Sequence, residues 1–275
     1  MSNRFLMCRP QYFDVNYVIN PWMSGNLHCV GRTRAQAQWS ALHALLQSDA
    51  DVELIEPEPG LPDMPFTANA GLVLGNRAVV SNFRHPERQT EEQHFERWFR
   101  DHGFDVHKFD RSVSFEGAGD ALLDRERGCI WMGHGHRSER AAAGHLQSVF
   151  GLEVVPLQLA DPRFYHLDTC FCPLPRGYVM YYPDAFSEDS QALLKRRISE
   201  DHAILVSEHD AERFACNAVN VGDQVILNGA SESLIQALAS AGFRTVQSSF
   251  SEFLRAGGAS KCLVLRLETP VAQSC

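Results

Sequence analysis

Residues 138–182, SERAAAGHLQSVFGLEVVPLQLADPRFYHLDTCFCPLPRGYVMYY, contain one complete unit of a repeat that decides the fold. The unit begins with an amphipathic helical pattern at 138–150, which Gly151 ends, and continues with an apolar strand pattern at 153–156. A loop then leads to Asp168, which is followed by two β-rich runs separated by a short turn. The stretch therefore predicts a helix, a strand and a hairpin, with a polar residue just before the hairpin.

The same unit can be followed five times along the chain. Helical patterns cover 33–46, 90–101, 138–150, 188–200 and 231–241, and the strand patterns after them cover 52–55, 105–109, 153–156, 202–206 and 244–246. The loops that follow lead to Asn69, Asp120, Asp168, Asn217 and Cys262, at intervals of 45–51 residues. Hairpin patterns come next at 71–74 and 78–81, 121–123 and 129–132, and 171–174 and 178–182, with Gly222-Asp223 as a fourth turn.

A period of this length is typical of a closed repeat architecture. We expect an α/β fold with closed five-fold pseudosymmetry, in which residues 1–275 form a single domain and the five polar loops point toward one axis. The alternative is a doubly wound α/β sheet, which also alternates helices and strands. The hairpins favour the closed repeat, because a parallel sheet would show single strands in their place.

The composition excludes several classes of partner. A formal charge of −9 over 275 residues argues against nucleic acid, because such binding depends on clustered lysine and arginine. No run approaches the roughly 18 apolar residues of a membrane span, and residues 1–10 lack the features of a secretory signal. We expect a cytoplasmic protein with reduced cysteines and a small cationic substrate. A homo-oligomer is left open, and Cys275 is expected at a frayed end.

A cysteine, a histidine and several carboxylates stand at or near the polar positions of the repeat. A thiolate nucleophile needs a proton donor, and His166 is the natural candidate for Cys262. On an extended segment, His166 and Asp168 would share one face of a strand. Carboxylates raise the pKa of a nearby thiol, so acids beside Cys262 suit a cationic substrate such as a guanidinium. The polar residues expected near the axis are Asn69, Glu116, Asp120, His166, Asp168, Asn217, Asn220 and Cys262.

A metal site is the main alternative for these residue types. His134 with His136, or Asp168 with Cys170 and Cys172, could be drawn as ligands. Neither set has the two well-spaced pairs of a structural zinc site. We therefore predict a protein without a metal or a cofactor.

Four motifs resemble the guanidino-group-modifying enzymes of the pentein superfamily. They are Phe66-Thr-Ala-Asn-Ala70, Phe115-Glu-Gly-Ala-Gly-Asp120, His166-Leu-Asp168 and Gly257-Gly-Ala-Ser-Lys-Cys262, in family order and across nearly the whole chain. The resemblance implies a five-bladed α/β propeller and a catalytic set of Cys262, His166 and Glu116. It also implies that a cysteine thiolate attacks the guanidinium carbon, that the histidine protonates the departing amine, and that water resolves the covalent thiouronium.

The resemblance implies a substrate-binding set as well. Asp168 and Glu116 would hold guanidinium nitrogens through charge-assisted hydrogen bonds. Arg137 and Arg88 would bind the substrate carboxylate, and Asp63 would hold its α-amine. The remaining members of the set are Asn69, Asp120 and Asn20, the last of which lies with Trp22 in an N-terminal segment that would close the site.

Asn69 departs from the aspartate that arginine deiminases and dimethylarginine dimethylaminohydrolases typically carry. An amide both donates and accepts hydrogen bonds, so it can hold a neutral ureido group as readily as a cation. Asn69 and the segment 19–23 resemble the arginine dihydrolases, which convert arginine to ornithine, ammonia and carbon dioxide, and this is the preferred hypothesis. Deimination or dimethylarginine hydrolysis to citrulline, and amidino transfer, are alternatives. A ribosome-binding factor of the same fold is a further one, which the acidic charge disfavours.

Overall fold

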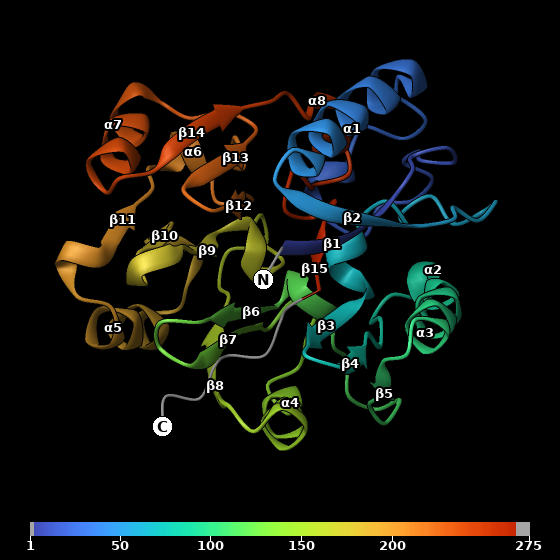
Figure 1. Ribbon diagram of the computed structural model, residues 1–275, viewed down its shortest axis with the longest axis horizontal. Helices are drawn as coiled ribbons and strands as arrows, with labels where there is room; N and C mark the ends of the chain where they lie inside the picture. The colour runs from blue at the N-terminus through green and yellow to red at the C-terminus, as the bar shows by residue number, and fades with distance from the viewer. Residues whose placement is uncertain (1–2, 268–275) are drawn as a thin grey trace.

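Five three-stranded sheets surround a central axis in the computed structural model of the protein, which describes residues 3–267 (Figure 1). This arrangement confirms the predicted five-bladed α/β propeller. Four blades consist of β3 (Gly71–Leu74), β4 (Arg77–Val80) and β5 (Asp105–His107); β6 (Ala121–Asp124), β7 (Cys129–His134) and β8 (Glu153–Gln158); β9 (Phe171–Pro173), β10 (Val179–Tyr181) and β11 (Ala203–Leu205); and β12 (Val219–Val221), β13 (Gln224–Leu227) and β14 (Arg244–Gln247). Cys275 lies outside the described residues.

Each of these blades repeats one topology. The first two strands form an antiparallel hairpin, and the third pairs in parallel with the second after the chain has passed through an outer helix. A parallel pair needs such a crossover connection, whereas a tight turn suffices for the hairpin. The order of elements in the repeat follows from this pairing: the hairpin supplies the first two strands, and the helix is the crossover to the third.

The fifth blade joins the two ends of the chain. β1 (Asn3–Cys8) lies between β15 (Leu265–Arg266), with which it is antiparallel, and β2 (Ala50–Ile55), with which it is parallel. The repeat pattern does not predict β1 or β15. β15 has only two residues, which is too short for a period-two signal, and the apolar run at 5–8 has no polar alternation. Both strands exist because the ring of blades closes there.

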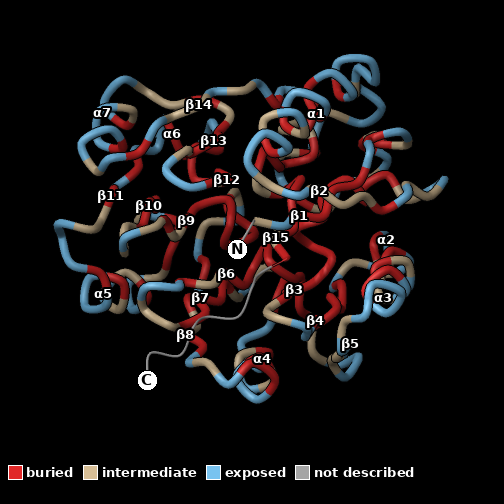
Figure 2. The backbone as a smooth tube through the Cα atoms, in the orientation of Figure 1, coloured by how far each residue is buried: buried red, intermediate tan, exposed pale blue. Residues whose placement is uncertain are grey.

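Helices cover the outside of the ring (Figure 1). They are α1 (Arg32–Gln47), α2 (Pro86–Gln89), α3 (Glu91–Asp101), α4 (Ala142–Phe150), α5 (Glu188–Arg197), α6 (Glu208–Ala211), α7 (Glu232–Ser240) and α8 (Ser251–Leu254). Each long helix turns one apolar face inward; α3, for example, buries Phe95, Trp98 and Phe99 at helical spacing. Figure 2 shows the same gradient, with buried residues around the axis and exposed ones on the outer faces of the helices.

The helix predicted at 138–150 begins four residues later than expected. Ser138 is not helical because its backbone N–H and hydroxyl both bind Asp120, at 3.2 and 2.6 Å. α5 likewise ends at Arg197, before the predicted boundary at residue 200.

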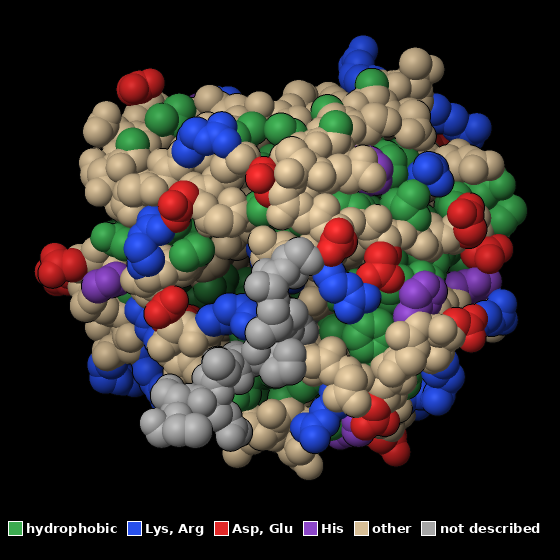
Figure 3. All heavy atoms as spheres, in the orientation of Figure 1, with side chains coloured by type: hydrophobic (Ala, Val, Ile, Leu, Met, Phe, Trp, Pro, Cys, Tyr) green, Lys and Arg blue, Asp and Glu red, His purple; other side chains and the backbone are tan. Residues whose placement is uncertain are grey.

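None of the helices formed by residues 3–267 is both long and apolar enough to cross a membrane. On the face shown in Figure 3, basic and acidic side chains are interspersed.

Short 3-10 turns lead into the first strands of three blades and carry the polar loops. They are η2 (Thr67–Ala70), η3 (Gly117–Gly119) and η4 (Leu167–Thr169). Gly117 has φ +62°, and a Cβ there would lie 2.8 Å from the Ala68 carbonyl oxygen, so only glycine allows these loops to pack backbone to backbone. The prediction that His166 and Asp168 share one strand face is wrong. η4 begins between them and turns their side chains toward different partners.

Candidate active site

Cys262 lies in a buried turn at the axis, 2% exposed. Its thiol donates to Asp168, with Sγ 3.5 Å from Oδ2, and accepts a hydrogen bond from Asn217 Nδ2 at 3.0 Å. Asn217 Oδ1 in turn accepts from the backbone N–H groups of Ala259 and Cys262, at 3.0 and 3.2 Å. Burial and the neighbouring Asp168 carboxyl raise the pKa of the Cys262 thiol well above its ordinary value. The cysteine therefore rests as a protonated thiol.

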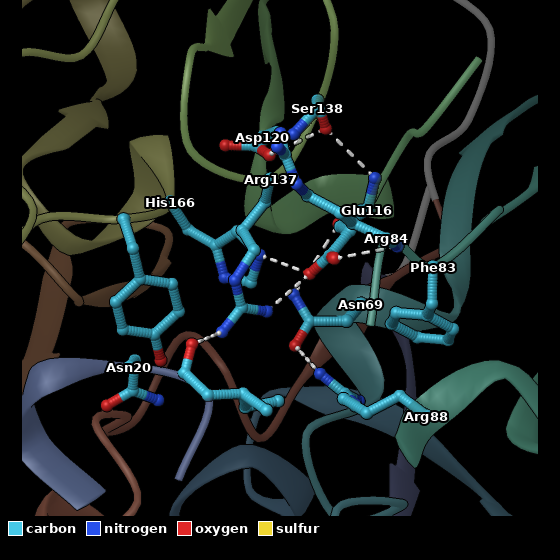
Figure 4. A network of polar contacts seen from close by, with 12 residues as sticks. Asn20, Asn69, Phe83, Arg84, Arg88, Glu116, Asp120, Arg137, Ser138 and His166 are labelled. Carbon is cyan, nitrogen blue, oxygen red and sulfur yellow. Dashed lines mark hydrogen bonds and ion pairs between the residues drawn. The ribbon is translucent and has the colours of Figure 1, made fainter. Parts of the chain in front are cut away.

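His166 and Glu116 face each other from neighbouring blades (Figure 4). The imidazole Nε2 is 2.7 Å from Glu116 Oε2, and Arg137 donates to the same oxygen at 2.8 Å. Because a carboxylate only accepts, Nε2 carries a proton in this contact. His166 Nδ1 is buried and has no hydrogen-bond partner among the described residues, so it is the atom available for proton transfer.

Glu116 is a fully buried, ionised carboxylate. Burial alone would raise its pKa, but Arg137 and His166 hold the pKa of Glu116 well below its usual range. Arg137 is itself fixed by a 2.9 Å hydrogen bond to the Ile19 carbonyl and by stacking 4.6 Å over the Tyr165 ring. Glu116 thus orients the imidazole and supplies a permanent negative charge beside it.

A second buried polar group surrounds Arg88. Its Nε and Nη2 donate to the two oxygens of Glu91 at 2.9 and 2.8 Å, and its Nη1 donates to Asn69 Oδ1 at 2.8 Å. Asp63 lies beside it, 3.9 Å from Nε, and accepts from the Tyr17 hydroxyl at 2.8 Å. Asp63 Oδ1 has no partner within residues 3–267. One carboxylate oxygen is therefore open to a cation.

A narrow cavity of about 10 Å³ lies among these groups. It is lined by Cys262, Asn69, Asp63, Arg88, Arg137, Tyr165, Phe66, Ala256, Ile19, Asn20 and Met23. Asn20 donates to the Ala256 carbonyl at 3.0 Å and accepts from the backbone of Trp22 and Met23, which ties η1 (Pro21–Met23) across the cavity. The structure thus brings the predicted thiol, amide, carboxylate and arginines to one small enclosed space.

Glu116, His166 and Asp168 do not line the cavity themselves. They adjoin it through contacts, Asp168 with Cys262 and Glu116 with Arg137 and His166. Asp120 and Asn220 have other surroundings. Asp120 was expected to bind substrate, but both its oxygens are occupied, Oδ2 by Ser138 and Oδ1 by the Leu167 backbone N–H at 3.0 Å, and it does not line the cavity. Asn220 was expected near the polar loops, yet it lines a separate cavity of about 70 Å³ formed largely by the inner strands, together with Lys261. Asp120 supports the loops that carry the site, because it joins two of them.

The metal hypothesis finds no grouped ligands in the part of the chain that the structure describes. Within residues 3–267, no three His, Cys, Asp or Glu side chains are placed to hold one ion. His134 and His136 are followed by Arg137, which binds Glu116. The expectation of a metal-free protein stays a prediction.

Some functional candidates had a weak sequence signal or none. Asn217 occupies a polar position of the repeat, which could have suggested its role of holding Cys262. Tyr165 directly precedes His166. Tyr17 and Glu91 belong to no repeat position, and only the fold brings them to Asp63 and Arg88.

Asp168 is expected to make the stability of the protein depend on pH. Burial raises the pKa of Asp168 to about 7, against opposing contributions from Lys261, Cys262 and Asn217. An unfolded aspartate has a pKa of about 3.9, so the folded state binds the extra proton between about pH 4 and 7, and the free energy of unfolding falls as the pH rises through that window.

We expect this free energy to fall by on the order of 2 kcal/mol between pH 5 and 7.5 from Asp168 alone. Asp168→Asn should flatten the decline, whereas Asp184→Asn, at an exposed position, should not. Urea denaturation at both pH values measures the effect. An equal decline in wild type and Asp168→Asn would contradict it.

Comparison with known proteins gives a consistent group of relatives. Residues 9–269 match the family described as N,N dimethylarginine dimethylhydrolase, eukaryotic. The bifunctional arginine dihydrolase/ornithine cyclodeaminase AgrE of Nostoc sp. is 51% identical over 98% of this chain and 38% of its own length. The N(G),N(G)-dimethylarginine dimethylaminohydrolase of Mycobacterium tuberculosis is 41% identical over 97% of this chain and 86% of its own.

A solved structure resembles this one throughout. It is the N-terminal domain of ArgZ, an arginine dihydrolase from cyanobacteria, bound to substrate as a cysteine-to-serine variant. It superposes with a TM-score of 0.97 at 50% identity, covering 98% of this chain and all of that one. The chain spans only 38% of the length of the bifunctional relatives it matches.

Proposed function

Because the chain belongs to the dimethylarginine dimethylaminohydrolase family of the pentein superfamily, we propose that it hydrolyses the guanidinium group of arginine in two rounds, to ornithine, two ammonia and carbon dioxide. The observation that carries this proposal is the amide of Asn69, which stands in the cavity between Arg88 and His166. Its oxygen is held by Arg88, so its amino group can donate to the oxygen of a neutral ureido group, which an aspartate at this position could not do. We also propose that residues 1–275 form one hydrolase domain.

In the first round, the Cys262 thiol passes its proton to His166 Nδ1 as Sγ attacks the guanidinium carbon, and the departing amine takes that proton from His166 and leaves as ammonia. The C–S bond gives a thiouronium on the enzyme. Water, losing its proton to His166, then attacks the same carbon, the C–S bond breaks, and citrulline remains. In the second round, attack on the ureido carbon releases a second ammonia, and hydrolysis gives the carbamate of ornithine, which loses carbon dioxide.

The resting site supports activation by the substrate itself. Cys262 is protonated because burial and Asp168 disfavour its thiolate. A guanidinium cation entering the cavity would offset the charges of Asp168 and Glu116, and so stabilise the thiolate that attacks it. His166 Nδ1, without a partner, is the acid/base atom, and Glu116 holds its Nε2–H. The charge of the substrate therefore assists the first round, on the guanidinium group.

The cavity also suits the two ends of a free amino acid. Asp63 Oδ1, the unpartnered oxygen, would accept from the α-ammonium group. Arg88 and Arg137 both line the cavity and would bind the α-carboxylate. Ile19, Asn20 and Met23 of the N-terminal segment also line the cavity, and Asn20 fixes this segment to the Ala256 carbonyl.

The direct test is to incubate the purified protein with arginine, and separately with dimethylarginine, and to follow products by mass spectrometry. Ornithine with two ammonia per arginine is the expected result. Citrulline as the end product would replace the proposal with a deiminase, or with a dimethylaminohydrolase if only the methylated substrate reacts, as the identity to the mycobacterial relative would suggest. Amidino transfer would appear only when an acceptor amine is added. The cytoplasmic location and the oligomeric state stay predictions.

A further inference from the structure

The carboxylate of Glu91 is buried at the start of α3 with 0% exposure. Its two oxygens accept from Arg88 Nε and Nη2 in a bidentate pair, at 2.9 and 2.8 Å. Burial alone would lower the pKa of Arg88, but Glu91 beside it raises that pKa above its ordinary value. The pair is the geometry in which a guanidinium is most rigidly held. Glu91 itself does not line the cavity.

This pairing leaves Arg88 with one nitrogen directed at the site. Nη2 also approaches the Asp63 carbonyl at 3.3 Å, whereas Nη1 donates to Asn69 Oδ1 at 2.8 Å (Figure 4). The Phe83 ring lies 4.4 Å from the guanidinium carbon and restricts its rotation. Arginine has donors and no acceptor, so the atom of Asn69 that faces it must be the oxygen.

The amino group of Asn69 consequently faces the opposite way, toward His166. A Cβ built on Gly119 would lie 2.3 Å from Asn69 Nδ2 and 3.3 Å from the His166 ring, which places both groups against the same glycine. Nδ2 is also 3.5 Å from the Glu116 carbonyl oxygen. The amide therefore presents a donor, not an acceptor, beside the acid/base residue.

We propose that Glu91 is a positioning residue that, through Arg88, holds the Asn69 amide with its N–H groups toward the reacting carbon and so selects for the second hydrolysis. The inference rests on the proposed function. A guanidinium offers only donors and gains nothing from an N–H, whereas the oxygen of a ureido group accepts one. The fixed amide therefore retains citrulline more than arginine. A freely rotating amide would turn its oxygen to a guanidinium and lose this preference.

The test compares Glu91→Gln with wild type and with Glu96→Gln. Glu96 lies on the same helix but pairs with Lys108 and Arg100 at the surface. For each protein, the rates of arginine consumption and of citrulline conversion to ornithine are measured separately. The α-carboxylate contact of Arg88 is shared by arginine and citrulline, so its loss lowers both rates by the same factor. We expect Glu91→Gln to lower citrulline conversion at least tenfold more than it lowers arginine consumption, so that citrulline accumulates. Glu96→Gln should match wild type.

A role of Glu91 in stability alone would lower both rates together, and that outcome overturns the inference, as does an unchanged product ratio. If Glu91→Gln does not fold, Glu91→Asp, which keeps the charge but shortens the side chain, is measured the same way and should accumulate citrulline to a smaller extent. Ornithine from wild type with an unchanged ratio in both variants would reject the inference and leave the proposed function intact. Citrulline as the end product of wild type would reject both.

Discussion

Replacing Cys262 with serine is expected to abolish turnover of arginine, with a loss of at least about 10⁴-fold in kcat. A serine hydroxyl has a far higher pKa than a thiol, and the Asp168 carboxyl that already disfavours the thiolate would disfavour an alkoxide more strongly. The other groups of the site keep their geometry, because Asn217 holds the turn through the backbone of Ala259 and residue 262.

The Cys262→Ser protein should therefore remain folded and should bind arginine. Circular dichroism checks the fold, isothermal titration calorimetry checks binding, and product analysis checks turnover. Cys29→Ser, at an exposed cysteine, makes the same chemical change away from the site and should leave activity unchanged. Residual turnover above about 1% of wild type would show that another group is the nucleophile.

Replacing Asn69 with aspartate should stop the reaction at citrulline. The carboxylate would keep the contact with Arg88 Nη1, now as an ion pair, and would present an oxygen to the guanidinium of arginine. It has no N–H to offer the ureido oxygen, so citrulline would meet an acceptor where the amide now donates. Losing this buried hydrogen bond to the ureido oxygen costs roughly 1–3 kcal/mol of free energy.

We expect Asn69→Asp to lower citrulline conversion about 100-fold and arginine consumption by no more than about tenfold, since 1.4 kcal/mol corresponds to a factor of ten. Time courses by mass spectrometry would show citrulline as the accumulating product. Asn76→Asp, in the exposed turn of the same blade, is the matched control. If Asn69→Asp forms ornithine at the wild-type rate, the Asn69 amide is not what allows the second hydrolysis.

Much of the fold could be predicted because its signals are local. Helix and strand periods, glycines at helix ends and the turns of the hairpins all act within about 15 residues, and the interval of 45–51 residues between polar loops made the five-fold repeat visible. The same interval pointed to Cys262, and the local sequence to His166. Local patterns did not show β1 and β15, whose pairing depends on the closure of the ring.

Within the site, the sequence indicated which chemical groups were present but not how they pair. Asp120 and Asp168 occupy equivalent positions of the repeat, yet Asp120 binds Ser138 and Leu167 whereas Asp168 lies against the thiol. The contacts of His166 with Glu116 and of Cys262 with Asp168 span 50 and 94 residues. Glu91 gave no signal, because a glutamate at the start of a helix is ordinarily a solvated residue that favours the helix dipole.

The sequence by itself therefore determined the repeat, the type of fold and the set of reactive groups, since these depend on residue types and spacing. Only the tertiary structure decided which atoms of those groups meet. A hydrogen bond requires a donor and an acceptor within about 3 Å at a suitable angle, and that relation between side chains from different blades exists only after the ring has closed.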